Sequence, residues 1–304
     1  MRIGIAGHCF QGFAPEELLE LLSNRWCVSA LDYWPWNGGD LDVEEYVYLA
    51  EKHGVEIFVV NLPSSVGRLC DPGSEAAARR ELLNSIDLAR ELGAPFVQFY
   101  TGVPARPDFY NTVKLLCAQL APIVEKAEHA AVTLVIENNL DQRGEDTYRL
   151  NPSRSPELLL ATIEALGSSR LKVCYDPCNF YTVGIEGFPY AYDLLRPHVV
   201  NVHVKDCRRF VKVWHEDLPY AEHLLIDSSE GAFLPTDVGL GAVNWRGILE
   251  RLGKDGYEGW LTLDPFTVPE KAVEWCDRSL AFMKEVIAEG AGLERGPDGG
   301  DARL

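Results

Sequence analysis

Residues 199–206 read VVNVHVKD, a β-branched apolar run that ends with an imidazole, an ammonium and a carboxylate. The apolar part predicts a buried strand, because Val packs well on a pleated surface that is covered on both faces. A strand of this kind needs a reason to end in His203, Lys205 and Asp206. Seven other segments of the chain contain similar runs. Together they predict the fold and explain why this strand ends in polar residues.

Eight short apolar runs alternate with longer segments in which apolar residues recur at helical spacing. The expected strands are 2–6, 27–34, 55–60, 95–100, 132–137, 171–176, 199–204 and 259–264. Strands that alternate with crossover helices pair in parallel, and eight such units in about 250 residues are typical of a closed barrel. The sequence therefore predicts an α/β fold, a single (β/α)8 TIM barrel.

An open, doubly wound sheet is the alternative fold, but it normally has a glycine-rich phosphate loop after its first strand. Here the first strand is followed by GHCFQGF, which lacks that motif, and the G-x-G of 239–241 follows a loop. We assign 1–289 to the barrel and the Gly-rich residues 290–304 to a disordered C-terminal tail. Residues 207–242 are expected to form a long loop after strand 7, over the barrel mouth.

Composition limits the kinds of partner. The 304 residues include 28 Lys and Arg against 46 Asp and Glu, a formal net charge of -18, which repels phosphate-rich partners such as nucleic acids. The chain has no run of about 18 apolar residues and no signal-peptide pattern. Its eight cysteines form no CxxC pair. We expect a cytoplasmic protein with no nucleic acid and no membrane partner.

The last inward position of each of the last four strands is polar. Residues two apart in a strand share a face, which places four side chains at the C-terminal mouth: Glu137, Asp176, His203 and Asp264. Three carboxylates there would repel one another unless a cation lies between them. We therefore predict that the four residues bind one divalent metal ion, Mn²⁺, Mg²⁺, Co²⁺ or Zn²⁺. For Asp264 the structural alternative is an acid that caps the helix after Pro265.

Several motifs resemble the xylose isomerase-like TIM barrel superfamily, specifically its sugar phosphate isomerase/epimerase group. They are IENN (136–139), YDPCN (175–179), VHVKD (202–206) and GLGAVNWRGILERLGKDGYEGWLTLD (239–264), and the resemblance spans roughly residues 2 to 288. The metal ligands of that family are Glu, Asp, His and Glu on strands five to eight, the positions of the four residues named above. The resemblance implies a divalent-metal-dependent isomerase or epimerase that acts on a small sugar or keto-polyol in carbohydrate metabolism.

The chain departs from this family at two positions. Asp264 stands where the family usually has Glu, and Asn179 stands where many relatives have His. A shorter acid reaches less far as a base, and an amide can orient a hydroxyl but cannot transfer protons. Arg209 lies six residues after His203, at the place of an arginine that helps to hold substrate in ketose epimerase relatives.

The implied reaction uses two carboxylates. Glu137 would remove a proton next to the substrate carbonyl, Asp264 would return one, and the metal would stabilise the enediolate between these steps. The candidate substrate-binding residues are His8, Asn179, Lys205 and Arg209. The alternative for His8, Lys205 and Arg209 is a position at the barrel rim without a role in substrate binding, where each side chain pairs with a neighbouring charge or is solvated.

Three other functions stay open. The first is a metal-dependent dehydratase of the inosose dehydratase kind, since the shorter Asp264 leaves room for a departing water. The second is a metal- and ligand-binding barrel without catalysis. The third is a phosphodiesterase like the AP endonuclease relatives. Such a site needs additional metal ligands, and the third and fourth expected strands end in Asn61 and Tyr100, which are poor ligands. Relatives are often dimers or tetramers, so a homo-oligomer is one option.

Overall fold

The computed structural model describes residues 1–62, 69–106, 108–140, 142–143, 148–149, 151–211 and 225–293. Eight parallel strands close into a barrel: β1 (Arg2–Ala6), β2 (Ala30–Tyr33), β3 (Glu56–Asn61), β4 (Phe96–Phe99), β5 (Thr133–Glu137), β8 (Leu171–Tyr175), β9 (Val199–Val204) and β13 (Trp260–Leu263). Neighbours in the barrel follow chain order, and β13 closes the ring against β1. The predicted (β/α)8 barrel is confirmed, and each of the eight expected strands overlaps one of these, although the expected strand 27–34 is shortened to β2.

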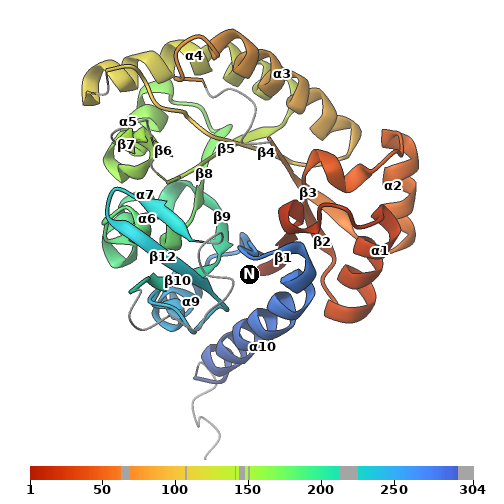
Figure 1. Ribbon diagram of the computed structural model, residues 1–304. Coiled ribbons are helices and arrows are strands. Elements are labelled where there is room, and N and C mark those ends of the chain that lie inside the picture. The colour runs from red at the N-terminus through yellow and green to blue at the C-terminus, as the bar shows by residue number, and fades with distance from the viewer. Residues whose placement is uncertain are drawn as a thin grey trace, which may run out of the picture.

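Helices surround the strands, as the ring of coiled ribbons in Figure 1 shows. The α-helices are α1 (Pro15–Glu20), α2 (Val43–Lys52), α3 (Glu75–Glu91), α4 (Phe109–Ala130), α5 (Pro156–Leu166), α6 (Pro177–Thr182), α7 (Tyr192–Leu195), α9 (Trp245–Lys254) and α10 (Pro269–Leu293). Shorter 3-10 or π turns are η1 (Gly7–Phe10), η2 (Leu21–Trp26), η3 (Pro35–Gly38), η4 (Pro152–Arg154), η5 (Gly187–Ala191) and η6 (Arg196–His198). Among the described residues, no helix has the length and apolar character that crossing a bilayer requires.

Local sequence explains where several helices begin. Asp42 accepts a hydrogen bond from the backbone N–H of Glu45 at the start of α2, and the Glu45 carboxylate accepts one from the Asp42 N–H, which makes a capping box. Ser155 and Asn244 cap α5 and α9 in the same way through one side-chain oxygen each. At the other end of the chain, α10 continues to Leu293 and so includes the first residues that the sequence assigned to the tail. Residues 294–304 lie outside the described part.

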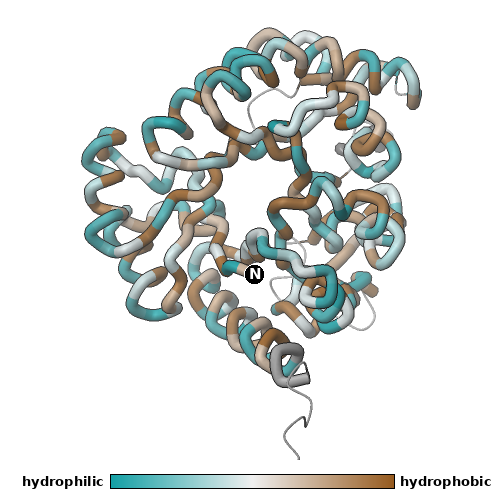
Figure 2. Tube along the Cα trace, turned by 180° about the vertical axis from the view of Figure 1, so that it is seen from behind, coloured by the Kyte–Doolittle hydropathy of each residue, from teal (hydrophilic) through white to brown (hydrophobic). Residues whose placement is uncertain are grey.

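The strands bury one set of side chains under the helices and point the other set into the barrel. Leu134 and Ile136 belong to the large core that the helices cover. Inside the barrel, at its N-terminal end, the rings of Phe58 and Trp260 stack with centroids 4.3 Å apart. Gly4 makes room for them, because a Cβ there would lie 2.7 Å from a Phe58 ring carbon. Figure 2 shows hydrophobic residues along the inner strands. Ala30 and Val59 join the two rings in a buried apolar cluster, so apolar packing fills this end of the barrel.

The chain after β9 forms a second, antiparallel sheet. Its strands are β10 (Asp206–Arg209), β12 (Gly231–Thr236) and β11 (Ile226–Ser228), in that spatial order. These strands occupy much of the segment that was expected to be a long loop, while residues 212–224, with His215 and His223, lie outside the described part. A separate two-stranded sheet pairs β6 (Gln142–Arg143) with β7 (Tyr148–Arg149).

Asp206 fixes this sheet to the chain that follows it. Its buried carboxylate accepts hydrogen bonds from the backbone N–H groups of Gly239, Gly241 and Val243, at 3.0–3.1 Å. A Cβ on Gly241 would lie 2.0 Å from the Asp206 Oδ1 atom, so glycine is required at that close approach. The G-x-G motif therefore encloses a carboxylate of the same chain and not a phosphate.

Candidate metal centre

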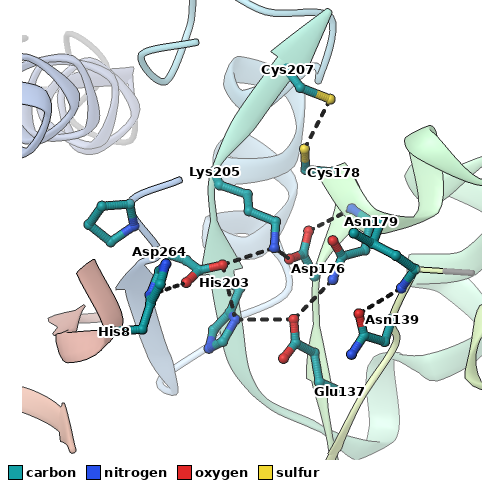
Figure 3. A network of polar contacts seen from close by, with 12 residues as sticks. His8, Glu137, Asn139, Asp176, Cys178, Asn179, His203, Lys205, Cys207 and Asp264 are labelled. Carbon is teal, nitrogen blue, oxygen red and sulfur yellow. Dashed lines mark hydrogen bonds and ion pairs between the residues drawn. The ribbon is translucent and has the colours of Figure 1, made fainter. Parts of the chain in front are cut away.

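Four side chains from consecutive strands meet at the C-terminal mouth of the barrel (Figure 3). Glu137 ends β5, His203 lies on β9, and Asp176 and Asp264 directly follow β8 and β13. All four are buried, with between 0% and 6% of their surface exposed. Each offers one ligand atom, and these atoms all lie within 4.8 Å of one another. The structure thus brings together the four residues that the sequence predicted as metal ligands.

Amide groups hold the carboxylate of Glu137. Its Oε2 atom accepts a hydrogen bond from Gln98 Nε2 at 2.8 Å, and its Oε1 atom accepts one from Asn179 Nδ2 at 2.9 Å. Burial acts to raise the pKa of Glu137, but the neighbouring charge of His203 outweighs burial and holds this pKa below its ordinary value. The carboxylate is therefore ionised at neutral pH and fixed in position.

Asp176 is positioned by the start of α6. The sequence DPCN places Asp176 at the N-cap and Pro177 at the first helical position, which suits a helix start. Asp176 Oδ1 accepts a hydrogen bond from the Asn179 backbone N–H at 2.8 Å. Asn138 holds the main chain of Asp176 through two hydrogen bonds, one to its N–H and one to its carbonyl. Burial raises the pKa of Asp176 to about 6, and its second oxygen, Oδ2, is left to face the centre of the site.

Lys205 reaches that centre from β9 (Figure 3). Its Nζ atom lies 2.7 Å from Asp176 Oδ2 and donates a hydrogen bond to Asp264 Oδ2 at 2.9 Å. Burial acts to lower the pKa of Lys205, but these carboxylates outweigh burial and hold the pKa well above its ordinary value. The ammonium therefore pairs with two candidate metal ligands and not with its sequence neighbour Asp206.

His203 has two buried ring nitrogens, and neither has a hydrogen-bond partner among the described residues. Nδ1 lies 3.4 Å from Glu137 Oε1 and 3.6 Å from Asp264 Oδ2. Nε2, on the other side of the ring, lies 3.6 Å from Asp32 Oδ2. A buried imidazole nitrogen that faces two carboxylates without a hydrogen bond suits a metal ligand, because a cation would satisfy all three groups.

Asp264 lies between Lys205 and His8. Its Oδ1 atom is 3.2 Å from His8 Nδ1, so His8 of η1 lies at the mouth, and its substrate-binding role stays a prediction. Burial acts to raise the pKa of Asp264, but the positive charges of Lys205 and His203 outweigh burial and lower it. The helix α10 begins only at Pro269, which argues against the alternative that Asp264 caps that helix.

The balance of charge also favours a cation. Three buried carboxylates face this space, those of Glu137, Asp176 and Asp264, and a fourth, that of Asp32, lies behind His203. Lys205 is the one lysine or arginine paired with any of them in the described part of the chain. Unpaired buried charge is costly, and a divalent ion bound by carboxylates and one imidazole would remove most of the excess. The residues present therefore fit a divalent metal ion.

The remaining predicted site residues differ in how they lie. Asn179 is buried beside Glu137, and its Oδ1 atom has no hydrogen-bond partner among the described residues. Arg209 is exposed on β10, where its Nη2 donates to the carbonyl of Glu230 at 2.6 Å and its guanidinium lies over the ring of Phe233. The substrate-binding role of both residues stays a prediction.

Three further residues belong to the site and were not predicted from the sequence. Gln98 and Asn138 hold Glu137 and Asp176, and Asp32 lies behind His203. A signal for two of them was present, because Asp32 and Gln98 stand at inward positions near the ends of expected strands, like the four ligands. Asn138 follows Glu137 in IENN, and no simple periodicity marks its role.

A second acidic group lies on the surface. Glu16, Glu20 and His53 could also present ligand atoms to a cation, but both glutamates are exposed. The ammonium of Lys52 already lies 2.6 Å from Glu16 Oε1. Exposed acidic groups of this kind are common on protein surfaces, so the buried group at the barrel mouth is the candidate site.

Known proteins with this architecture include several enzymes. No curated protein sequence matches this chain significantly. An L-ribulose 3-epimerase structure aligns with 19% identity and a TM-score of 0.71, over 98% of this chain and 99% of that chain. The probable 3-DHS dehydratase AsbF from Bacillus anthracis aligns with 12% identity and a TM-score of 0.71, over 93% and 99%. An IOLI protein with a binding zinc atom aligns with 13% identity and a TM-score of 0.69, over 95% and 99%.

At such low identities, the likeness to these structures shows the fold alone. The sequence itself carries a broader match, because a family model described as "Xylose isomerase-like TIM barrel" covers residues 23–286. That range includes β2 to β13 and all four candidate ligands. The chain therefore belongs to the xylose isomerase-like TIM barrel family.

Proposed function

We propose that this protein is a divalent-metal-dependent isomerase or epimerase of a small keto sugar or keto-polyol. The observation that carries the proposal is the buried group of Glu137, Asp176, His203 and Asp264, whose ligand atoms lie within 4.8 Å of one another. A divalent ion bound there would polarise neighbouring oxygen atoms of a substrate and make the adjacent C–H group more acidic. The similarity in fold to an L-ribulose 3-epimerase is consistent with this chemistry.

Glu137 is the proposed base that removes the proton. Its two amide donors, Gln98 and Asn179, fix the carboxylate and leave further lone pairs on each oxygen. A carboxylate held in one position needs little reorganisation before proton transfer, which favours general base catalysis. The Oδ1 atom of Asn179, buried and without a hydrogen-bond partner among the described residues, could accept a hydrogen bond from a substrate hydroxyl.

A second candidate function is a dehydratase, and the surroundings of Asp264 favour it. Asp264 is paired with Lys205 and lies against His8, and its lowered pKa makes it a weak base. An epimerase needs a second group that exchanges a proton with carbon, whereas a dehydratase needs an acid that protonates a leaving hydroxyl. His8 lies beside Asp264 and could supply that acid.

Small polar molecules are the proposed partners of this site. His8 and Lys205 line the mouth on the side of Asp264, where they could bind oxygen atoms of a bound sugar. Arg209 on β10 could contact a more distant hydroxyl or carboxylate, although its guanidinium also holds the carbonyl of Glu230. Proteins of this kind usually need several such contacts, because a sugar offers many hydroxyl groups and little apolar surface.

Isotope exchange separates the two reactions. We would incubate the protein with Mn²⁺ and a panel of ketoses and inososes in D₂O, and follow the products by mass spectrometry and NMR. Deuterium uptake without loss of water supports the isomerase or epimerase, and loss of water supports the dehydratase. Chelation should abolish either activity, and added Mn²⁺ should restore it. Binding of a sugar without exchange or product under any of Mn²⁺, Mg²⁺, Co²⁺ and Zn²⁺ would indicate a non-catalytic barrel.

A further inference from the structure

Lys205 holds an unusual position inside the candidate metal centre. It is 6% exposed, and its ammonium lies between two carboxylates that we predict as metal ligands (Figure 3). The distances are 2.7 Å from Nζ to Asp176 Oδ2 and 2.9 Å from Nζ to Asp264 Oδ2. A buried lysine is normally tolerated only with partners of this kind, so these contacts account for its burial.

The oxygens that Lys205 uses are the ones that a metal ion would need. Asp176 Oδ1 already accepts the backbone N–H of Asn179, which leaves Oδ2 for the centre of the site. Asp264 Oδ1 faces His8, whereas Oδ2 faces the unpartnered Nδ1 of His203. The ammonium and a divalent cation therefore require the same two atoms.

The chain around Lys205 allows its side chain, but not its main chain, to give way. The carbonyl of Lys205 accepts a hydrogen bond from the Trp245 indole N–H at 3.1 Å, and the residue follows directly on β9. The four-carbon stem above this fixed main chain has several rotatable bonds, so the ammonium can move while the barrel does not. A divalent ion can therefore replace the ammonium at the two carboxylates when a single side chain moves.

We propose that Lys205 competes with the divalent ion for Asp176 and Asp264, so that it weakens metal binding and stabilises the protein in the absence of metal. The inference rests on the proposed function, because it requires the metal centre. When the ion binds, the ammonium leaves these oxygens and can turn toward the substrate side of the mouth. One lysine thereby allows a barrel with four buried carboxylates to fold without metal.

The substitution Lys205→Met tests this inference because it predicts two effects of opposite sign. Methionine has a similar length but no charge, so Mn²⁺ should bind roughly tenfold tighter or more, in line with the coupling of close charge pairs. The same change leaves the buried carboxylates unpaired, so the melting temperature of the chelator-treated protein should fall. Titration calorimetry with Mn²⁺ alone and thermal unfolding in the presence of a chelator measure the two effects.

Three further variants act as controls. Lys114 is exposed on α4, so Lys114→Met makes the same change in net charge away from the site and should alter neither measurement. Lys205→Arg retains the charge and should bring no gain in Mn²⁺ affinity. Lys205→Gln keeps two N–H donors without the charge. If Lys205→Met does not fold without metal, Lys205→Gln should still bind Mn²⁺ more tightly and have a lower melting temperature after chelation than the wild-type protein.

The outcomes separate this inference from the function beneath it. Tighter Mn²⁺ binding together with a lower melting temperature of the metal-free neutral variants supports competition. Unchanged or weaker Mn²⁺ binding by folded neutral variants, while the wild-type protein binds Mn²⁺, would overturn the inference alone. If neither the wild-type protein nor the folded neutral variants bind Mn²⁺, both the metal centre and the role of Lys205 in it are wrong.

Discussion

The two ends of the barrel use the same strands for opposite purposes. At the N-terminal end, Trp260 of β13 stacks on Phe58, with the space that Gly4 leaves. At the C-terminal end, the chain of the same strand leads to Asp264, whose carboxylate is paired with Lys205 and lies against His8. The apolar end contributes stability through buried surface, whereas the charged end places functional groups at a cost in stability. A residue that stabilises the fold and a residue that belongs to the candidate site therefore lie only a few positions apart in the chain.

The largest expected effect concerns the charged end. Glu137→Gln should lower deuterium exchange by about 10²- to 10⁴-fold, because the amide cannot accept the proton. Metal binding should fall less, since three other ligands remain. Exchange in D₂O and titration calorimetry with Mn²⁺ measure the two quantities, and Glu125→Gln on the exposed face of α4 is the matched control. Exchange close to the wild-type rate would show that Glu137 is not the base.

The apolar end should respond in stability alone. Trp260→Ala removes one ring of the stacked pair inside the barrel and should lower the free energy of unfolding by about 3–5 kcal/mol. The Mn²⁺ affinity of the folded variant should match that of the wild-type protein. Urea denaturation and calorimetry would test this, and a large fall in Mn²⁺ affinity would mean that the two ends are coupled.

Asp32 sharpens the comparison because it is a buried charge that lies behind a ligand. Its carboxylate faces Nε2 of His203, so it can orient the ring and keep Nδ1 toward the other ligands. We expect Asp32→Asn to weaken Mn²⁺ binding by about 10- to 100-fold, the usual effect of losing such a partner. The absorption spectrum of the Co²⁺-loaded protein should change as well, since it reports ligand geometry. Unchanged affinity and spectrum would remove Asp32 from the site.

The same residue predicts a pH dependence of stability for the metal-free protein. Burial raises the pKa of Asp32 from 3.8 to about 6, so the folded state holds this proton more tightly than the unfolded state does. The contribution of Asp32 to stability is therefore fully present below pH 4 and is lost as the pH rises through about 6. Asp32→Asn should reduce this loss, so its melting temperature relative to the wild-type protein should be higher at pH 8 than at pH 4.

The smallest effect is expected on the surface. Glu20 belongs to the exposed acidic group near His53, and Glu20→Gln should change the free energy of unfolding by less than about 0.5 kcal/mol. The number of Mn²⁺ ions bound per chain should not change. A lower stoichiometry in calorimetry would show that this group, and not only the barrel mouth, binds metal.

Much of the fold was readable because parallel strands and their helices leave strong periodic patterns. Side chains alternate between the two faces of a strand, and this alternation predicted that four residues point into the barrel: Glu137, Asp176, His203 and Asp264. The partners of Lys205 could not be predicted in this way, because Asp264 lies 59 residues away in sequence. The alternation of side chains in a strand does not tell which charged groups at the barrel mouth pair with one another.

The segment after β9 shows a second limit. Arg209 falls in the segment 207–242 that the sequence predicts as a loop, but it lies on the four-residue strand β10, which is too short to leave a clear alternation. Asp206 ends the run VVNVHVKD, and its carboxylate accepts hydrogen bonds from the backbone N–H groups of Gly239 and Gly241. Contacts of this type depend on the path of the chain and have no signature in local sequence.

The central claim is that one divalent ion binds between the acidic ends of β5, β8 and β13 and the imidazole of β9. Anomalous scattering from crystals of the full chain grown with Mn²⁺ tests it most directly, because it locates the ion. The account predicts a single strong peak in direct contact with Glu137, Asp176, His203 Nδ1 and Asp264. Absence of a peak among these four residues, or a peak confined to the surface group of Glu16, Glu20 and His53, would contradict it.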